Sequence, residues 1–197
     1  MNEENEKLAK IKKSSRVGKK VTNILALIVG IVSIIMIVTG IIFLASGDKL
    51  ESKFAEAAAS GVISEPSDKM FYASAFHVEM IDPTKIETSS PALKHALETR
   101  PYTITYGIYF ILVGLGLAGA TVLLKLLSSG FAIIEKEDNP FTPAVIKRVT
   151  IVLIVLSIVM GLTIGGAYVV IGLLSTWLIH SVMEYGRTLQ IQSDETL

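Results

Sequence analysis

Long runs without charged side chains constrain this chain more than any other feature of its sequence. Val21–Ser46 contains no charged side chain, Tyr102–Leu127 contains only Lys125, and Val149–Met183 again contains none. About 20 apolar helical residues cross the roughly 30 Å hydrocarbon core of a bilayer. Inside that core backbone polar groups must pair within the segment, which favours helices. The runs therefore predict an all-α membrane protein.

The third run is too long for a single span, because a straight helix of its roughly 35 residues would be about 52 Å long. Three glycines, Gly161, Gly165 and Gly166, mark the expected break. We therefore expect four transmembrane helices, at 21–46, 102–134, 144–163 and 167–187, the second with a cytoplasmic extension. The remaining segments are a basic tail at 1–20, an extracytoplasmic segment at 47–101, a loop at 135–143 and a tail at 188–197.

Composition narrows the class of protein further. Hydrophobic residues make up 51% of the 197-residue chain and charged residues 18%, with a mean hydropathy of +0.58. Soluble domains usually carry about 25% charged residues, so the lipid bilayer is the expected environment. The 18 basic and 18 acidic residues cancel, so no bulk charge indicates direct nucleic-acid binding. The chain has no cysteine, which excludes disulfides, thiolate metal sites and a cysteine nucleophile.

Basic residues set the expected orientation. The tail at 1–20 holds seven Lys or Arg, and the short stretch 135–148 holds three more. The 47–101 segment has six basic and nine acidic residues. Short basic segments resist translocation, so both termini and the 135–148 stretch are expected in the cytoplasm. The first run is much longer than the roughly 7–15 apolar residues of a secretory signal, which favours a retained anchor, with cleavage near Ala45 as the alternative.

The extracytoplasmic segment is long enough for structure of its own, and its pattern predicts a small α+β unit. Apolar residues recur at helical spacing over about 48–60, which predicts a helix there. Alternating apolar and polar residues predict a strand over 70–81. Ser90 and Pro91 are typical of an N-cap and a first-turn proline, so a second short helix is expected to continue to about residue 98. Thr142 and Pro143 repeat this pattern before the third span.

Small residues within the predicted spans favour close helix packing. Three pairs are spaced four residues apart: Gly114/Ala118, Gly116/Ala120 and Gly161/Gly165. Such pairs let helix backbones approach one another in a membrane. We favour packing within a single bundle, and a seam between copies in a homo-oligomer is the alternative.

One pair of ionisable residues stands out near the end of the fourth span. His180 and Glu184 are four residues apart and share a helix face. Ionisable residues inside a membrane are typical of proton or ion relays, and Thr163 would belong to such a path. The simpler interpretation, which we favour, is a hydrogen-bonded cluster at the inner end of the helix.

Other chemistry has little support in the sequence. The one G-x-G-x-x-G, at 114–119, lies inside a predicted span with no strand before it, so it is not a cofactor loop. His77 and His95, with Glu79 and Glu98, are candidate zinc ligands, but their spacing matches no recognised metal motif. We therefore expect no enzymatic activity, no cofactor and no metal site.

Two segments resemble a known family. Asn139-Pro140-Phe141-Thr142, followed by Val145-Ile146-Lys147-Arg148, is similar to the cytoplasmic signature of the bacterial family called domain of unknown function 2975. Ala144-Val145 replaces the Glu-Asn that is more usual there. The segment from Glu184 to Gln190, followed by Ser193 to Leu197, looks like the C-terminal ending of that family. The resemblance covers about residues 102–197.

The resemblance implies a four-helix protein of the bacterial plasma membrane, of a family often encoded beside a small helix-turn-helix transcription regulator. The candidate partner-binding residues are Pro140, Phe141, Thr142, Lys147, Arg148, Glu184, Tyr185, Gly186, Leu189, Gln190, Asp194 and Glu195. We therefore expect a non-enzymatic accessory or regulatory protein that engages a cytoplasmic partner. A small transporter or channel subunit is the alternative.

Overall fold

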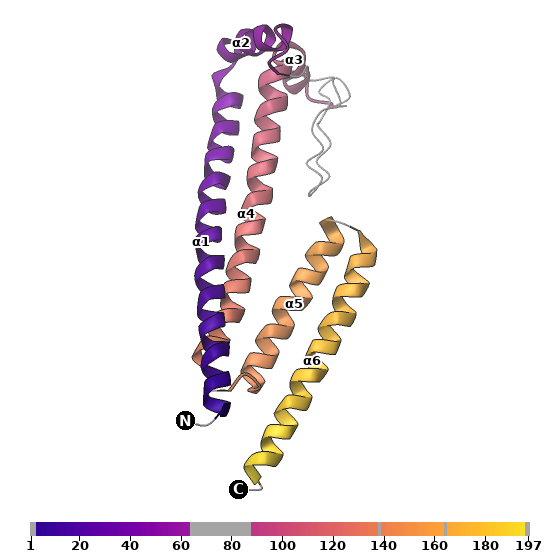
Figure 1. The fold of residues 1–197 in the computed structure, drawn as a ribbon. Coiled ribbons are helices and arrows are strands. Elements are labelled where there is room, and N and C mark those ends of the chain that lie inside the picture. Colours follow the sequence, from indigo (N-terminus) through magenta and orange to yellow (C-terminus); the bar gives the residue numbers. More distant parts are fainter. Residues whose placement is uncertain (1–2, 64–87, 138, 164, 196–197) are drawn as a thin grey trace. The chain divides into compact units, whose positions relative to one another are not determined.

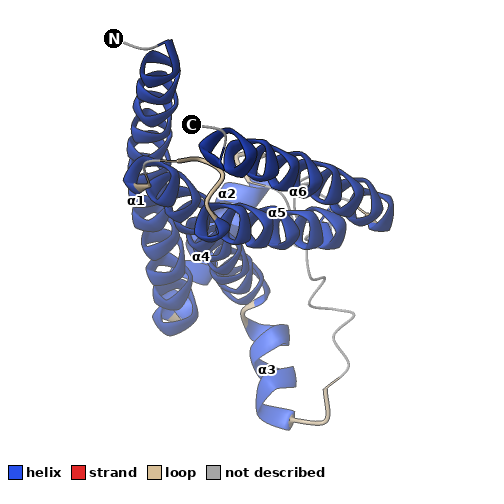
Figure 2. Ribbon diagram, turned by 90° about the horizontal axis from the view of Figure 1, so that it is seen from below, coloured by secondary structure: helices blue, strands red, loops and turns tan. Residues whose placement is uncertain are grey.

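The computed structural model describes residues 3–63, 88–137, 139–163 and 165–195, and within these ranges every regular element is a helix (Figures 1 and 2). The elements are α1 (Glu3–Ser46), α2 (Asp48–Ala59), α3 (Pro91–Thr99), α4 (Pro101–Lys136), α5 (Pro143–Thr163) and α6 (Gly166–Glu195). The strand expected over 70–81 lies outside the described residues, so the α+β unit has no support there.

Four helices, α1, α4, α5 and α6, are long and apolar enough to cross a membrane. They correspond to the four spans predicted from the three apolar runs, so the prediction of an all-α protein with four such helices is confirmed. Large apolar side chains point outward along them, as Ile34 (63% exposed) and Trp177 (69%) illustrate. Such surfaces suit lipid better than water, since each exposed apolar side chain in water forgoes about 1.5–3 kcal/mol of burial.

Contacts divide the chain into two compact units. Unit 1 combines residues 1–27 with 121–197, and unit 2 comprises residues 28–120. The helices α1 and α4 each contribute one part to unit 1 and one part to unit 2.

In unit 2, α1 and α4 pack closely because small residues face each other. The Ser33 hydroxyl donates a hydrogen bond to the Gly114 carbonyl at 2.8 Å. A Cβ atom on Gly40 would lie only 2.6 Å from the Gly107 carbonyl oxygen, so this contact requires glycine. Ser33 and Gly40 on α1 are seven positions apart, as are Gly107 and Gly114 on α4. This spacing keeps each pair on one face of its helix. Gly114 thus packs within the chain, whereas a Cβ atom on Gly116, in the second small-residue pair, would meet nothing within 4 Å.

Both helices predicted in the segment after α1 are present. The backbone turns from α1 into α2 at Gly47, whose φ of 56° suits glycine. The Phe54 ring on α2 then packs against Phe43 of α1 and Tyr106 of α4, with ring centroids 5.1 and 5.6 Å apart. Further along, α3 has Ser90 at its N-cap and Pro91 in its first turn, although the Ser90 side chain makes no capping hydrogen bond.

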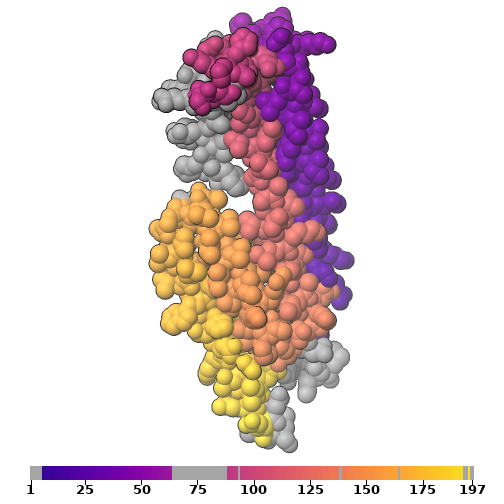
Figure 3. Space-filling model, turned by 180° about the vertical axis from the view of Figure 1, so that it is seen from behind, coloured from indigo at the N-terminus to yellow at the C-terminus, as the bar shows by residue number. Residues whose placement is uncertain are grey.

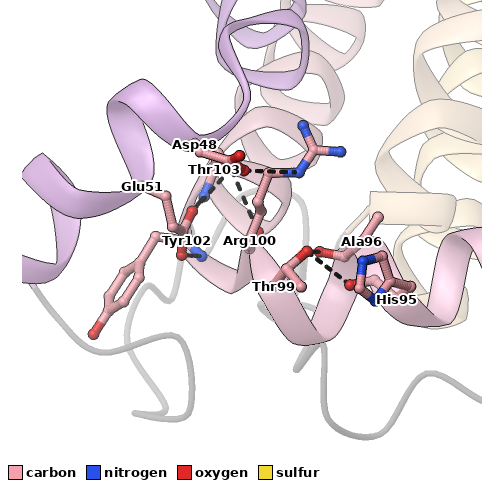
Figure 4. Close-up of polar contacts among 8 residues, drawn as sticks. All are labelled: Asp48, Glu51, His95, Ala96, Thr99, Arg100, Tyr102 and Thr103. Atoms are coloured by element: carbon pink, nitrogen blue, oxygen red, sulfur yellow. Dashed lines mark hydrogen bonds and ion pairs between the residues drawn. The ribbon is translucent and has the colours of Figure 1, made fainter.

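Glu51 fastens α2 to the start of α4 (Figure 4). Its carboxylate accepts hydrogen bonds from the backbone N–H of Tyr102 at 2.9 Å and of Thr103 at 2.8 Å, and from the Thr103 hydroxyl at 2.9 Å. The first N–H groups of a helix have no partner within it, and the positive end of the helix dipole favours an anion. Asp48 adds an ion pair to Arg100 at 4.0 Å.

In unit 1, α5 and α6 form a hairpin and pack against each other, and the end of α6 extends past α5 (Figure 3). Gly165 has a φ of 143° at the turn, which confirms the predicted break between the last two spans. A Cβ atom on Gly161 would overlap the Val169 side chain, and one on Gly172 would lie 2.5 Å from the Ser157 hydroxyl. Glycine therefore sets the spacing of this hairpin.

Two helices are longer than the sequence suggested. The basic tail at 1–20 is helical from Glu3 and continues into the first apolar run without a break. The last helix continues past residue 187 to Glu195, where we had expected a tail. Neither stretch contains a proline, and after Gly186 the chain has no glycine either, so nothing local ends the helix.

Candidate functional site

The turn between α4 and α5 is built by its own polar side chains. The Asn139 Oδ1 accepts a hydrogen bond from the backbone N–H of Phe141 at 2.8 Å, which makes an Asx turn. The Thr142 hydroxyl then accepts one from the backbone N–H of Val145 at 3.3 Å, and Pro143 opens the helix. This confirms Thr142 as the N-cap of α5.

This turn is joined to the far end of the chain. The Asn139 Nδ2 donates a hydrogen bond to the Gln190 Oε1 of α6. The Phe141 ring packs against Gly186, where an added Cβ would lie 2.7 Å from the ring. We call these four residues, Asn139, Phe141, Gly186 and Gln190, the motif junction. The segment that begins at Asn139 and the one that begins at Glu184, far apart in sequence, therefore meet in unit 1.

Other candidate residues lie around the motif junction and outside it. Tyr185 and Leu189 are on the exposed side of α6, with exposed fractions of 65% and 47%. Glu184 forms an ion pair with Arg187 on its own helix at 3.5 Å. Pro140 is half-buried in the turn, while Lys147 and Glu195 are exposed. The helix α6 includes Asp194, whose side chain is not among those described.

His180 contacts α5 rather than Glu184. Its Nδ1 and the Thr150 hydroxyl are 3.0 Å apart, and the tautomer decides which of them donates. No hydrogen bond or ion pair joins His180 to Glu184 within the described ranges. The Thr163 hydroxyl donates to the Val159 carbonyl of its own helix at 2.9 Å. His180 and Glu184 thus bond different residues, and both the inner-end cluster and the relay stay predictions.

Sequence reasoning missed the polar contacts between α4 and its neighbours in unit 1. Glu135 of α4 forms ion pairs with Arg16 at 2.8 Å and with Lys19 at 3.0 Å, both on α1. One turn earlier on α4, the Phe131 ring fills the space beside Gly18. The sequence did contain a signal for these ion pairs. Glu135 follows the apolar run at 102–127, while Arg16 and Lys19 precede the run at 21–46.

Two further cations of unit 1 bind neutral oxygen atoms. The Lys125 Nζ donates to the Asn23 Oδ1 of α1 at 2.9 Å. The Arg148 guanidinium of α5 donates to the Ser129 hydroxyl of α4 from Nε at 3.1 Å and from Nη2 at 2.6 Å. Arg148 thus links α5 to α4, a role that its place in the motif did not reveal.

No metal centre is evident in the part of the chain that the structure describes, where no three His, Asp or Glu side chains gather. Two of the four candidate zinc ligands, His77 and Glu79, lie outside that part. No protein-family model, curated protein or solved structure matches the chain. The resemblance to the domain of unknown function 2975 family therefore stays a prediction.

Proposed function

We propose that this is a non-enzymatic accessory or regulatory protein of the bacterial plasma membrane that binds a soluble cytoplasmic partner. In this proposal both termini and the turn before α5 are cytoplasmic. The support for this orientation is the excess of Lys and Arg in the tail at 1–20 and in the stretch 135–148, against the acidic balance of 47–101.

The observation that carries the proposal is the continuation of α6 past its apolar run. The stretch from Gly166 to Met183 makes about 27 Å of helix, close to the thickness of the hydrocarbon core. The next stretch, Glu184–Glu195, adds about 18 Å beyond it. We call this segment the α6 extension. In this proposal its exposed apolar side chains, Tyr185, Leu189 and Ile191, lie beyond the hydrocarbon core.

The α6 extension has two different faces. Gly186 and Gln190 hold one face to the turn before α5 through the motif junction. Tyr185 and Leu189, one helical turn apart, lie on the exposed side. An apolar pair on a helix that is already formed and fixed suits docking into a groove of another protein. Because the helix is ordered beforehand, binding needs little further loss of chain entropy.

The partner that we propose is a soluble helical protein, and the family resemblance suggests a small helix-turn-helix regulator. Such a protein would be held at the membrane by the α6 extension and away from DNA. The motif junction would fix the angle at which the extension leaves the membrane.

The chain offers a matched pair of variants to test this proposal. Leu189 and Ile191 are both apolar and both 47% exposed, yet two helical positions place them about 200° apart around α6. We expect Leu189→Glu to abolish co-purification of a soluble helix-turn-helix protein from native membranes, while Ile191→Glu retains it. Recovery of no such protein with the wild type, or equal loss in both variants, contradicts the proposal.

A further inference from the structure

Lys125 and Arg148 differ from the other cations that join the helices of unit 1. Arg16 and Lys19 share the Glu135 carboxylate. Lys125 instead donates to the Asn23 amide oxygen, and Arg148 donates to the Ser129 hydroxyl. Within the described ranges neither of these two cations forms an ion pair with a carboxylate. Both positive charges are therefore held in place by neutral groups, with no carboxylate of the described residues paired to them.

Both cations lie at the ends of apolar runs. The helix from Tyr102 to Lys125 is about 35 Å long, which is slightly more than one hydrocarbon thickness. Arg148 directly precedes the run that begins at Val149, and Asn23 is the third residue of the run that begins at Val21. In the proposed four-span topology, these positions lie where the hydrocarbon core meets the phospholipid head groups.

Lys125 lies on the same face of α4 as Ser129, the residue that Arg148 bonds. Lys125 and Ser129 are four residues apart, so their Cβ atoms are about 6 Å apart along one side of the helix. Arg148 reaches that side from α5 through its bonds to Ser129. Guanidinium groups carry five N–H donors and ammonium groups three, so both retain donors beyond those used in the described bonds. An anion on this face of α4 could accept from both.

We propose that Lys125 and Arg148 bind the phosphate group of an anionic phospholipid, with Asn23 and Ser129 holding the two cations in position. Basic sites between transmembrane helices are suited to anionic head groups. Arginine matches the geometry of phosphate oxygens, and lysine adds a point charge. A lipid is the source of phosphate held at this depth, whereas inorganic phosphate would have to leave water. This inference does not depend on the proposed function.

The test uses the purified full-length chain in a neutral detergent, with native mass spectrometry to count bound lipid. Phosphatidylglycerol is the anionic probe, phosphatidylcholine the zwitterionic one, and inorganic phosphate the free competitor. The test variant is Lys125→Gln/Arg148→Gln. The matched control is Lys136→Gln/Lys147→Gln, which removes the same charge from exposed positions of the same two helices.

We expect the wild type and the control to retain phosphatidylglycerol in preference to phosphatidylcholine. Loss of two charge-assisted contacts should weaken phosphatidylglycerol binding by roughly tenfold or more in the test variant. The charge-retaining variant Lys125→Arg/Arg148→Lys should keep the preference, which guards against a folding defect. Equal binding by test and control variants, no preference for the anionic lipid, or displacement of the lipid by millimolar inorganic phosphate would each overturn the proposal.

Discussion

Gly186 shows how a single residue without a side chain determines a contact between distant parts of the chain. The Phe141 ring occupies the space that any Cβ on Gly186 would need, and the nearest ring atom would be 2.7 Å away. Gly116, in contrast, has no described neighbour within 4 Å of the place that a Cβ would take. Packing therefore requires glycine at position 186 and does not require it at position 116.

This difference gives a prediction at the residue scale. Gly186→Ala should lower the stability of the protein in detergent by about 1–3 kcal/mol, because the ring must move or the helices must separate. Gly116→Ala should leave stability unchanged or raise it by up to about 1 kcal/mol, since alanine is the better helix former. Thermal unfolding followed by circular dichroism compares the two, and equal midpoints would contradict the role assigned to Gly186.

At the scale of elements, apolar runs and glycines predicted most of the fold. The expected break between the last two spans is present because Gly165 adopts a positive φ that other residues avoid. The start of α1 and the end of α6 were harder to predict from the sequence. Polar residues without proline or glycine continue a helix as readily as they form a tail. Turn residues were informative as well, and Thr142 caps α5 as its pattern predicted.

Contacts between elements were much harder to predict. The motif junction needed two segments far apart in sequence to meet, and nothing in local pattern indicates that they do. The same is true of Glu51, whose carboxylate caps the distant helix that begins at Pro101. Small residues such as Ser33 and Gly40 carried a usable signal, because they lie seven positions apart on one face of α1.

The Glu51 contact provides a prediction at this scale. Glu51→Ala should cost about 1 kcal/mol or more, because it leaves the first N–H groups of α4 without their acceptor and releases α2. Hydrogen exchange at the backbone of α2 and at Tyr102 and Thr103 should become faster. Glu56→Ala is the control, since Glu56 is an exposed carboxylate on the same helix. Equal exchange in both variants would show that Glu51 does not fasten α2.

For the whole molecule, the proposed partner-binding role and the alternative transport role make different demands. A transport path through the last two helices would depend on His180 and Glu184. His180 instead hydrogen-bonds Thr150, and Glu184 pairs with Arg187. We therefore expect proteoliposomes of the wild type to show proton and cation flux equal to that of empty vesicles. Flux above this background that disappears in both His180→Ala and Glu184→Gln would favour a transporter.

In the topology proposed above, four helices cross the membrane and leave both ends of the chain in the cytoplasm. The chain has no cysteine, so single cysteines can be placed at Lys13, Lys53, Lys136 and Gln192 and labelled in intact cells with an impermeant maleimide. We expect labelling from outside at Lys53→Cys only, and at the other three positions after the membrane is opened. Labelling of Lys13→Cys and Gln192→Cys from opposite sides, or of Lys53→Cys only after opening, would contradict it.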